Sequence, residues 1–558
     1  MRFQIRRTMP PRSKKPSRAP ALHEEKNIVS EQSFILTRRV AGPCPARWSQ
    51  VAGVVAVGAC VSFWQPAGSA WASDNSQASQ PAVTETTTGT STGTTAAWPA
   101  GIGVTTASAT TTPGTDTSRP LILKPAVAPV PSQQGGETIA GTPAKTKPAT
   151  PEEARIDALR LRGVVNVPTV SDTLLGNWGG FRSTLADFGI GFNGLLSGSF
   201  AGNLLHQPSR TMGVQRYIGQ SREVDTSNSY LALTYDMGRI GMKDGLAQLQ
   251  VCTEGSTVGS YPHGLARLCA AYVDQPLFNH HVDLQVGYLA NNYQFANPLV
   301  GGSISSGSLG PSASLLTELG LSVSGIGAPG VNLGVNFGHF YNLFGIQRST
   351  APGGFNYEAQ TANRYGIRFN DIGAGALVIN EVGYRKLAAP GVKKTWIRMA
   401  GLGNFSHFTN YSDPKTKTQA AGAYFLADQQ FTQPDPAHPV RGLYAGFSYM
   451  YASPSAFSYS QYLEGRFYIV GPFKFRPRDQ LSFVANRTKV SRSYQDYYVE
   501  RGYKVQNAVY NFTLAYTYRV IPGLYFNGGL TYAVHPSAIY NREEGNPLIF
   551  KFVVVMHI

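Results

Sequence analysis

The most regular feature of this chain is an alternation of apolar and polar positions over residues 189–558, seen best in Asn507–Arg519. Alternation with a period of two predicts a β-strand with two different faces, one suited to lipid and the other to water. The face predicted to meet lipid carries Ala508, Tyr510, Phe512, Leu514, Tyr516 and Tyr518, and the other carries Asn507, Val509, Asn511, Thr513, Ala515, Thr517 and Arg519.

The same pattern recurs on both sides of this segment. Ile521-Pro522-Gly523 predicts a short turn, and residues 524–534 and 548–558 predict two further strands. In the last strand, Lys551 and His557 lie opposite the apolar face. Weaker copies predict strands over 230–237, 331–338, 364–370 and 463–469; in the third of these, Tyr365, Ile367 and Phe369 share the apolar face.

These strands predict an all-β fold, a transmembrane antiparallel β-barrel of the Gram-negative outer membrane. No run of about 18 apolar residues occurs, so the sequence predicts no ordinary transmembrane helix. A soluble β-sandwich also alternates, but predicted export, aromatic side chains near strand ends and strands that continue to Ile558 favour a closed barrel.

The pattern gives 16 or 17 candidate strands, and we choose 16 because single-chain bacterial barrels have even strand numbers. One candidate between Leu315 and Lys386 must then be false. A barrel of this size leaves an aqueous lumen. The turn at Ile521–Gly523 is expected on the periplasmic side, and His535–Pro547 is expected to be an outer loop.

Residues 1–72 predict a signal peptide with an extended n-region. The apolar run Val51–Phe63 has the length of an h-region, and Ala70-Trp71-Ala72 matches a cleavage pattern. A buried core helix is the alternative for the apolar run. A start site further downstream would also account for the long n-region, in which Arg38, Arg39 and Arg47 precede the apolar run.

Two further segments precede the barrel. Residues 73–150 form a low-complexity Thr, Ser, Gly and Pro stretch with too few apolar side chains to fold, which predicts a disordered periplasmic tether. A plain linker and a peptidoglycan-binding segment are both open for it. Residues 151–188 predict a short helical entrance, with helical turns at 151–162 and 181–188 around a break at Gly179-Gly180. The barrel itself is predicted over 189–558.

Composition and charge agree with this organisation. Charged residues make up only 14%, whereas 60 Gly, 29 Tyr and 28 Phe suit tight turns and aromatic girdles. The predicted signal carries 11 Lys or Arg and 3 Asp or Glu, so its removal lowers the formal net charge from +16 to +8. We therefore infer no nucleic-acid binding from the basic composition.

Four cysteines are present, and Cys44 and Cys60 would leave with the signal. Cys252 and Cys269 remain, in an oxidising compartment. They flank a probable hairpin centred near Tyr261 and are symmetric about it, which predicts a cross-strand disulfide.

The inward faces of the predicted strands suit a wet pore. They carry Gly, Asn, Thr and Ser, and charged side chains are also placed inward because a charge facing lipid costs roughly 2–4 kcal/mol at mid-membrane. Each of these charges could be a solvated wall residue without a selective part. Their mixed signs argue against strong ion selectivity, which usually needs a ring of one sign. The pore-lining candidates are Asp236, Glu254, Arg364, Arg368, Glu381, Arg385, Glu464, Arg466 and Arg519.

A constriction is predicted after the strand Val282–Ala290. The segment there mixes amide donors and acceptors with aromatic rings, as a neutral sugar or polyol requires, and leads into the Gly/Ser-rich stretch 301–314. A long loop of small residues could fold into the lumen; an ordinary surface loop is the alternative. The constriction candidates are Asn291, Asn292, Tyr293, Gln294 and Asn297.

Signatures of enzymes are missing from the sequence. Its one G-x-S-x-G match, Gly89-Thr90-Ser91-Thr92-Gly93, lies in the low-complexity stretch and not in a strand–turn–helix context, and the chain contains no H-E-x-x-H and no phosphate-binding loop. His280-His281 is an isolated pair, and metal binding would need further ligands that the sequence does not place. We therefore predict no enzyme activity, no metal and no cofactor, since a solute that moves down its gradient needs none.

Three short motifs occur in an order that resembles the carbohydrate-selective porin (OprB) family over about residues 174–558. The first is Leu175-Gly176-Asn177-Trp178-Gly179-Gly180-Phe181-Arg182 with Leu185 and Gly189-Ile190. The second is Arg441-Gly442-Leu443 with Gly471-Pro472-Phe473 and Arg476-Pro477-Arg478-Asp479. The third runs from Tyr518 to Pro522, through Leu530-Thr531-Tyr532-Ala533-Val534-His535-Pro536, to Asn546-Pro547-Leu548.

The resemblance implies a sixteen-stranded porin that passes monosaccharides and related polyols by facilitated diffusion. Its expected partners are small neutral carbohydrates, outer-membrane lipid and the barrel-assembly machinery. Because the chain ends in Ile558 instead of an aromatic residue, recognition by that machinery would rest on Phe550 and Phe552. The alternatives are an autotransporter-like or adhesin barrel, a general non-selective porin, and a membrane-embedded hydrolase, which the lack of a nucleophile motif in the predicted barrel disfavours.

Overall fold

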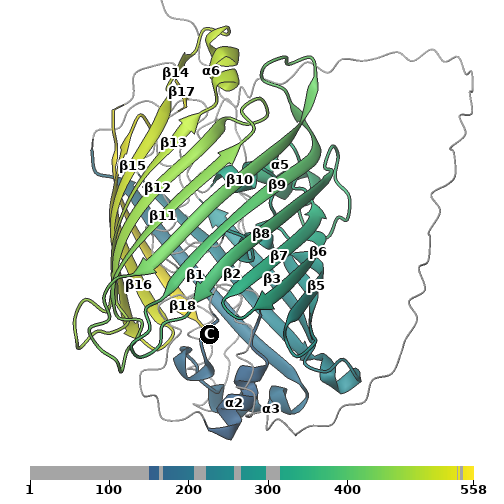
Figure 1. Cartoon of the computed structure of the whole chain (residues 1–558), viewed down its shortest axis with the longest axis vertical. Helices are drawn as coiled ribbons and strands as arrows, with labels where there is room; N and C mark the ends of the chain where they lie inside the picture. The colour runs from purple at the N-terminus through teal and green to yellow at the C-terminus, as the bar shows by residue number, and fades with distance from the viewer. Residues whose placement is uncertain are drawn as a thin grey trace, which may run out of the picture. The chain divides into compact units, whose positions relative to one another are not determined.

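The computed structural model describes residues 150–162, 167–205, 222–256, 266–296, 314–323, 325–536, 538–540 and 545–558. The predicted signal peptide and nearly all of the predicted tether lie outside these residues. Within them, sixteen antiparallel strands close into a barrel in which β1 pairs with β18 (Figure 1). The all-β barrel and its strand number are therefore as the sequence predicted.

The barrel strands vary in length from 8 to 15 residues. They are β1 (Ile190–Asn203), β2 (Arg222–Asp236), β3 (Leu246–Ser256), β4 (Arg267–Leu277), β5 (Val282–Leu289), β6 (Ala328–Phe337), β7 (Phe340–Arg348), β8 (Ala376–Lys386), β9 (Thr395–Thr409), β10 (Lys417–Gln430), β11 (Gly442–Ala452), β12 (Tyr459–Val470), β13 (Gln480–Val490), β15 (Ala508–Ile521), β16 (Leu524–Val534) and β18 (Leu548–His557). A separate two-stranded sheet pairs β14 (Lys504–Val505) with β17 (Ile539–Tyr540).

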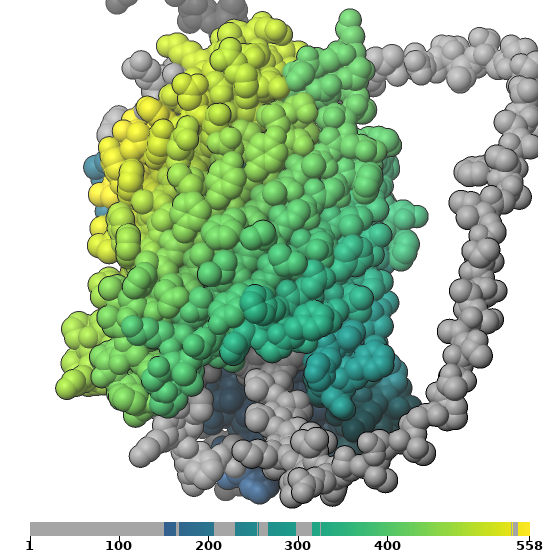
Figure 2. Space-filling view, viewed as in Figure 1, coloured from purple at the N-terminus to yellow at the C-terminus, as the bar shows by residue number. Residues whose placement is uncertain are grey.

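Each strand presents one face outward and the other inward. On β15, Phe512 and Leu514 are 42% and 52% exposed, whereas the alternating Asn511 and Thr513 are buried. Figure 2 shows the outer side of the strands as a continuous wall of side chains on one face of the barrel. An apolar outer surface of this kind meets lipid, so the alternation in the sequence follows from the two environments.

The predicted strand at 364–370 is wrong. These residues belong to the connection between β7 and β8, and among the described residues β6 and β7 are the only strands between Leu315 and β8. Gly366 has a φ of +73°, which lies outside the β region, and its N–H bonds to the carbonyl of Asn363 in a turn. Removing this candidate restores the even strand number.

Short helices stand between and before the strands. The segment before β1 contains α2 (Pro151–Ala158), η1 (Val170–Asp172), η2 (Trp178–Gly180) and α3 (Phe181–Asp187). Thr150 and Glu153 form a capping box that fixes the start of α2. The remaining helices are η3 (Met237–Ile240), η4 (Asn291–Tyr293), α4 (Ser314–Glu318), α5 (Gly354–Tyr357), η6 (Glu358–Ala362) and α6 (Arg492–Val499).

Both the entrance helices and the C-terminus lie at one end of the barrel. Leu174 donates a backbone hydrogen bond to His557 at 2.8 Å, and α3 packs on β1 (Figure 1). The turn after Ile521 is at this end, while the connections after β5, β7 and β13 leave from the other end. The second end carries the longer connections, as the extracellular end of such barrels does.

Candidate functional site

The connection between β5 and β6 folds against the inner wall of the barrel. Leu315 and Leu319 are fully buried and belong to one apolar cluster with Leu377, Ile379 and Tyr424. The last three point inward, since their neighbours along β8 and β10 alternate outward. The long connection therefore occupies part of the lumen and narrows it.

Hydrogen bonds to inward side chains fix this connection at its start. Asn291 is fully buried: its side-chain amide donates to Gln347 at 2.9 Å, and its oxygen accepts from Asn332 at 2.7 Å. Ser322, near the end of the connection, bonds to the same Gln347 oxygen at 3.0 Å. Asn404 donates to the carbonyl of Leu319 at 2.6 Å. Buried side-chain amides that hydrogen-bond in this way fix the irregular backbone of the connection, which has no strand ladder to hold it.

A small pocket with about 10 Å³ of free space, room for roughly one water-sized group such as a hydroxyl, lies between this connection and the wall made by β3, β4 and β5. Its lining combines amide and aromatic side chains with small apolar ones. Gln250 is 2% exposed, and its side-chain Nε2 has no hydrogen-bond partner among the residues that the structure describes. A buried donor without a partner costs about 1–3 kcal/mol, so a ligand hydroxyl that accepted from it would recover that cost. The lining residues are Gln250, Ala270, Tyr272, Leu289, Ala290, Tyr293 and Gln294.

The entrance segment reaches into the barrel and borders this pocket. Leu161 packs in one cluster with Tyr230 and Tyr293, and the Tyr272 hydroxyl donates to the carbonyl of Arg162 at 2.6 Å. Arg162 also donates its backbone N–H to Gln248 at 3.1 Å. The segment is thus part of the pore wall at the end that holds the C-terminus, a position that its sequence did not predict.

The other end of the same segment is fixed by charge. Asp172 is 5% exposed and pairs with both Arg478 and Arg519. In α2, burial raises the pKa of Asp157, while Arg160 opposes the rise. The Asp157 carboxylate accepts the Val170 N–H at 2.8 Å and so joins α2 to η1.

Opposite charges pair along the inner wall of β10 to β12. Arg466 is 1% exposed and donates to Asp428 at 2.6 Å and to Glu464 at 2.7 Å. Tyr468 donates its hydroxyl to Asp428 at 3.0 Å. These charges neutralise one another locally, so this part of the wall does not form a ring of one sign.

A second polar group stands on β7, β8 and β10. Glu381 is buried and accepts hydrogen bonds from the hydroxyls of Tyr341, at 2.7 Å, and Tyr424. Tyr424 also accepts the backbone N–H of Ala296 at 3.1 Å. This group therefore links the wall to the constriction segment, and it includes two tyrosines that the sequence did not single out.

The predicted constriction residues lie where the connection meets the pocket. Asn291, Asn292 and Tyr293 form η4, and Tyr293 and Gln294 line the pocket, whereas Asn291 is turned into the wall. Asn297 lies outside the described residues. The sequence feature that predicted this location was the cluster of amide and aromatic side chains directly after a strand.

The predicted lining residues are dispersed. Glu381, Arg385, Glu464, Arg466 and Arg519 lie on inner faces of strands. Asp236, at the end of β2, accepts the Gly238 N–H in a turn. Glu254 is on β3, but its side chain is outside the described residues. Arg364 and Arg368 are exposed in the β7–β8 connection, where no strand places them on an inner face, so the alternation that put them in the lining does not apply.

Other inward groups could have been found from alternation alone. Asp428 shares a face with Tyr424 and Leu426 on β10, and Arg398 shares one with Trp396 on β9, where its guanidinium lies 3.5 Å from the indole centre. Both strands lie upstream of the segments in which the sequence pattern is strongest. Asp428 and Arg398 therefore line the pore together with the predicted lining residues on inner faces.

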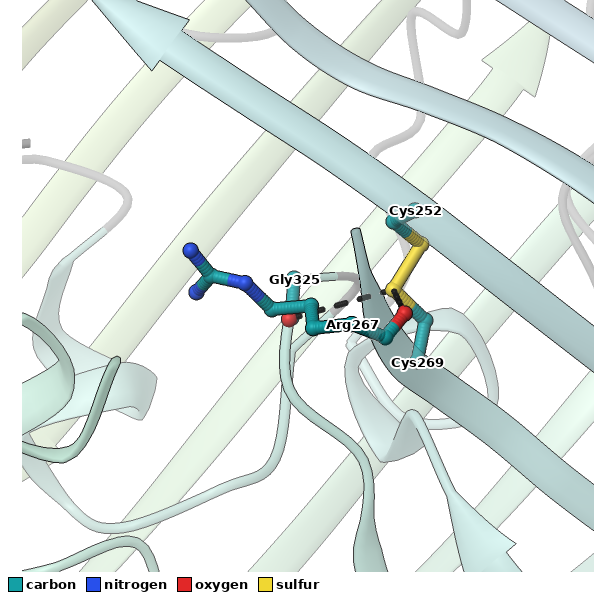
Figure 3. Close-up of a disulfide and its surroundings, with 4 residues drawn as sticks. All are labelled: Cys252, Arg267, Cys269 and Gly325. Atoms are coloured by element: carbon teal, nitrogen blue, oxygen red, sulfur yellow. Dashed lines mark hydrogen bonds between the residues drawn. A yellow bond between two sulfur atoms is a disulfide. The ribbon is translucent and has the colours of Figure 1, made fainter. Parts of the chain in front are cut away.

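Cys252 and Cys269 form a disulfide with a Cα–Cα distance of 5.8 Å (Figure 3). Their pairing is not direct, because Cys252 lies opposite Arg267 and the register shifts between Gln250 and Val251. Cys269 Sγ lies 3.8 Å from the carbonyl oxygen of Gly325, which belongs to the β5–β6 connection. The disulfide thus supports the base of the connection that narrows the lumen.

Among the described residues, no helix has the length and apolar character needed to cross a membrane. Within the same residues, no three His, Cys, Asp or Glu side chains gather closely enough to hold a metal ion.

The model of the carbohydrate-selective porin family OprB matches residues 244–552, which is more than half of the chain. Among curated proteins, none matches by sequence. The fold is similar to a high-pH structure of OprB from Pseudomonas putida, with a TM-score of 0.58 and 17% identity over 70% of this chain and 99% of that one.

Two further structures cover similar shares. A low-pH structure of the same Pseudomonas putida protein has a TM-score of 0.44 and 17% identity, over 70% of this chain and 99% of that one. The outer membrane channel DcaP of Acinetobacter baumannii has a TM-score of 0.41 and 11% identity, over 66% and 97%.

Proposed function

This chain belongs to the OprB family of carbohydrate-selective porins, and we propose that monosaccharides and related polyols are the solutes that it passes. It acts as an outer-membrane sugar porin, in which the solute diffuses down its gradient through the lumen. No cofactor or energy source takes part.

The observation that carries the choice of solute is the pocket beside η4. Gln250 offers a buried amide donor, and Tyr293 and Gln294 add an aromatic ring and a second amide from the constriction segment. A sugar presents hydroxyls that both donate and accept, together with an apolar ring face. A few polar groups set among apolar and aromatic side chains orient such a ligand.

The charges of the wall favour a neutral solute over an ion. Arg466 is matched by Asp428 and Glu464, and Glu381 is hydrogen-bonded to two tyrosines. A solute that carried a net charge would meet both signs within this part of the lumen and gain little from either. We therefore expect weak ion selectivity in planar bilayers.

Liposome swelling with the purified full chain tests the proposal. We expect faster swelling with glucose-sized sugars and polyols than with disaccharides, and a reversal potential near zero under a salt gradient. Liposomes without protein and liposomes with heat-unfolded protein serve as controls. No swelling with any monosaccharide would contradict the sugar porin, and equal rates for monosaccharides and disaccharides would favour a general pore.

The constriction segment can be tested in the same assay. We expect Tyr293→Ala to lower the ratio of monosaccharide to disaccharide uptake without preventing assembly, and the same result for Asn297→Ala. Tyr449→Ala, an outward-facing tyrosine on β11 that is 37% exposed, is the matched control. An unchanged ratio in both constriction variants would remove this segment from the selective part of the pore.

A further inference from the structure

The connection between β7 and β8 carries a row of exposed apolar side chains, residues 364–372, which we name the rim strap. Tyr365, Ile367, Phe369 and Ile372 are 57%, 61%, 67% and 79% exposed. An exposed apolar cluster of this kind marks a site of contact with a partner or a membrane. Two exposed arginines, Arg364 and Arg368, alternate with these residues.

The rim strap is fixed to the outer side of the barrel. The Tyr288 hydroxyl donates to the carbonyl of Ile367 at 2.8 Å, and the Leu268 N–H donates to the carbonyl of Tyr365 at 2.9 Å. Tyr288 points outward, because its neighbour across the ladder is Ala271, whereas the next residue on β4, Tyr272, points into the lumen. The strap therefore lies beside β4, next to the end of β5 and in contact with its outward Tyr288, at the end that carries the long connections.

Buried hydrogen bonds hold the base of the rim strap in one conformation. Glu358 is fully buried and accepts from Arg348 at 2.5 Å, from the Ala351 N–H at 2.7 Å and from Asn363 at 3.2 Å. Asn363 in turn accepts the Arg368 N–H at 3.0 Å. Exposure of the apolar side chains is thus a property of a fixed structure and does not result from a loose loop.

We propose that the rim strap binds an acylated glycolipid that carries phosphate groups, in the outer leaflet of the membrane. The apolar side chains would meet the acyl chains, and Arg364 and Arg368 would bind the phosphates, for which the planar guanidinium is well matched. The nearest acid in the strap, Asp371, is directed to Arg348 and to the Ile372 N–H, so it does not neutralise the two arginines.

The same placement accounts for the alternation that predicted a strand at 364–370. Barrels carry girdles of aromatic residues at the level of the lipid headgroups. Here Tyr365 and Phe369 come from a connection that runs along the rim instead of from a strand. In the strap, every second side chain would meet acyl chains and the side chains between them would meet headgroups. A barrel strand alternates in the same way between lipid and lumen, so both give a sequence pattern with a period of two.

Binding of lipid A to the purified full chain in detergent micelles, followed by native mass spectrometry, tests this proposal. The double variant Arg364→Gln, Arg368→Gln should bind lipid A about twenty-five-fold more weakly than the wild type, since each arginine contributes on the order of a factor of five. Dephosphorylated lipid A should bind both proteins equally weakly. The matched control Arg492→Gln, Arg501→Gln removes two exposed charges from the connection between β13 and β15 at the same end and should bind as the wild type does.

A second measurement follows the apolar side chains. Phe369→Trp should add a fluorescence component that brominated acyl chains quench in vesicles, whereas Tyr357→Trp in α5, 40% exposed but outside the strap, should add less quenched fluorescence. Unchanged sugar uptake in the arginine variants shows that the pore is assembled. Equal lipid A binding in the strap and control variants would overturn the proposal. So would a dimer of the wild type that dissociates on Phe369→Ser, because a second copy would then cover the strap.

Discussion

The Asp172 carboxylate lies 2.5 Å from the Arg478 guanidinium, although 306 positions separate the two residues in the chain. Asp172 belongs to the segment before the barrel, and Arg478 belongs to the turn between β12 and β13. Arg519 of β15 pairs with the same carboxylate. The entrance segment is thus tied to the wall at a site that is nearly closed to solvent.

Asp172→Asn should release the entrance segment from the mouth of the barrel. Two guanidinium groups lose their carboxylate, and a hydrogen bond to a charged group contributes about 2 kcal/mol to stability. Limited proteolysis of the purified protein should cut within residues 150–188 several times faster than in the wild type. Asp187→Asn is the control, because its pair with Arg155 is about half exposed on both sides and exposed pairs contribute little. Equal cleavage of the two variants would contradict the anchoring role.

Gln347→Ala should loosen the connection that narrows the lumen. Gln347 bonds to Asn291 and Ser322 and donates to the Gly320 carbonyl at 3.2 Å, so one side chain holds both ends of the connection. We expect a larger single-channel conductance and faster disaccharide uptake relative to monosaccharide.

The matched control for this change is Gln419→Ala, since Gln419 is exposed on the outward face of β10. Conductance and uptake should then stay at wild-type values. A Gln347→Ala protein with normal conductance and a normal uptake ratio would show that the connection stays in place without this network.

Gln250→Leu should change stability and transport in opposite directions. Its Nε2 is buried without a partner in the described part of the chain, so an apolar side chain of similar size should stabilise the protein by about 1–2 kcal/mol. A sugar that places a hydroxyl in the pocket would lose one hydrogen bond, and monosaccharide uptake at low concentration should fall by roughly tenfold. Thermal unfolding and swelling rates measure the two effects. A variant that is less stable, or one whose uptake is unchanged, would remove Gln250 from the sugar path.

Alternation was a reliable guide wherever a strand separates lipid from the lumen. The predicted strand 524–534 has the same bounds as β16, and the faces of β15 are those the pattern indicates. At 364–370 the pattern misleads, because the chain lies along the rim and a left-handed Gly366 interrupts it. A period of two reports two environments, and it does not by itself report a hydrogen-bonded ladder.

The sequence did not predict which residues pair across the lumen, and the reason is a different one. The contacts of Asn291 with Gln347 and of Asp172 with Arg478 join residues 56 and 306 positions apart. They depend on how a long connection folds inward and on the register of many strands in succession. A single sequence contains a clear signal for each strand but only a weak one for these relations.

A pH dependence is expected in the turn between β10 and β11. A hydrogen bond from His438, together with the Ala437 N–H, holds the pKa of Asp435 below its ordinary value of 3.8. A lowered pKa in the folded state adds stability that is present above pH 3.8 and is lost as the pH falls through the folded value. The difference in thermal midpoint between the wild type and Asp435→Asn should therefore shrink on acidification below pH 4. A difference in thermal midpoint that grows toward low pH would contradict the expected direction. Asp413→Asn, in an exposed turn at the opposite end of the barrel, is the control.

Removal of the disulfide should destabilise the barrel and the connection inside it. Cys252 and Cys269 are 17 positions apart, for which closing the loop contributes about 3 kcal/mol. Urea unfolding of the wild type should shift to lower concentration when reductant is added. The Cys252→Ser, Cys269→Ser variant should unfold at that lower urea concentration with or without reductant. This variant controls for any effect of the reductant other than cleavage of the disulfide.

The contact of Cys269 with Gly325 gives this prediction a local part. Protease cleavage within the β5–β6 connection should become faster in the serine variant, while cleavage in the connection between β13 and β15, which is remote from the disulfide, should not change. Alkylation of the untreated wild type followed by mass measurement completes the test. Two modified thiols on Cys252 and Cys269 without reductant would contradict the disulfide, and normal cleavage in the serine variant would limit its effect to the β3–β4 hairpin.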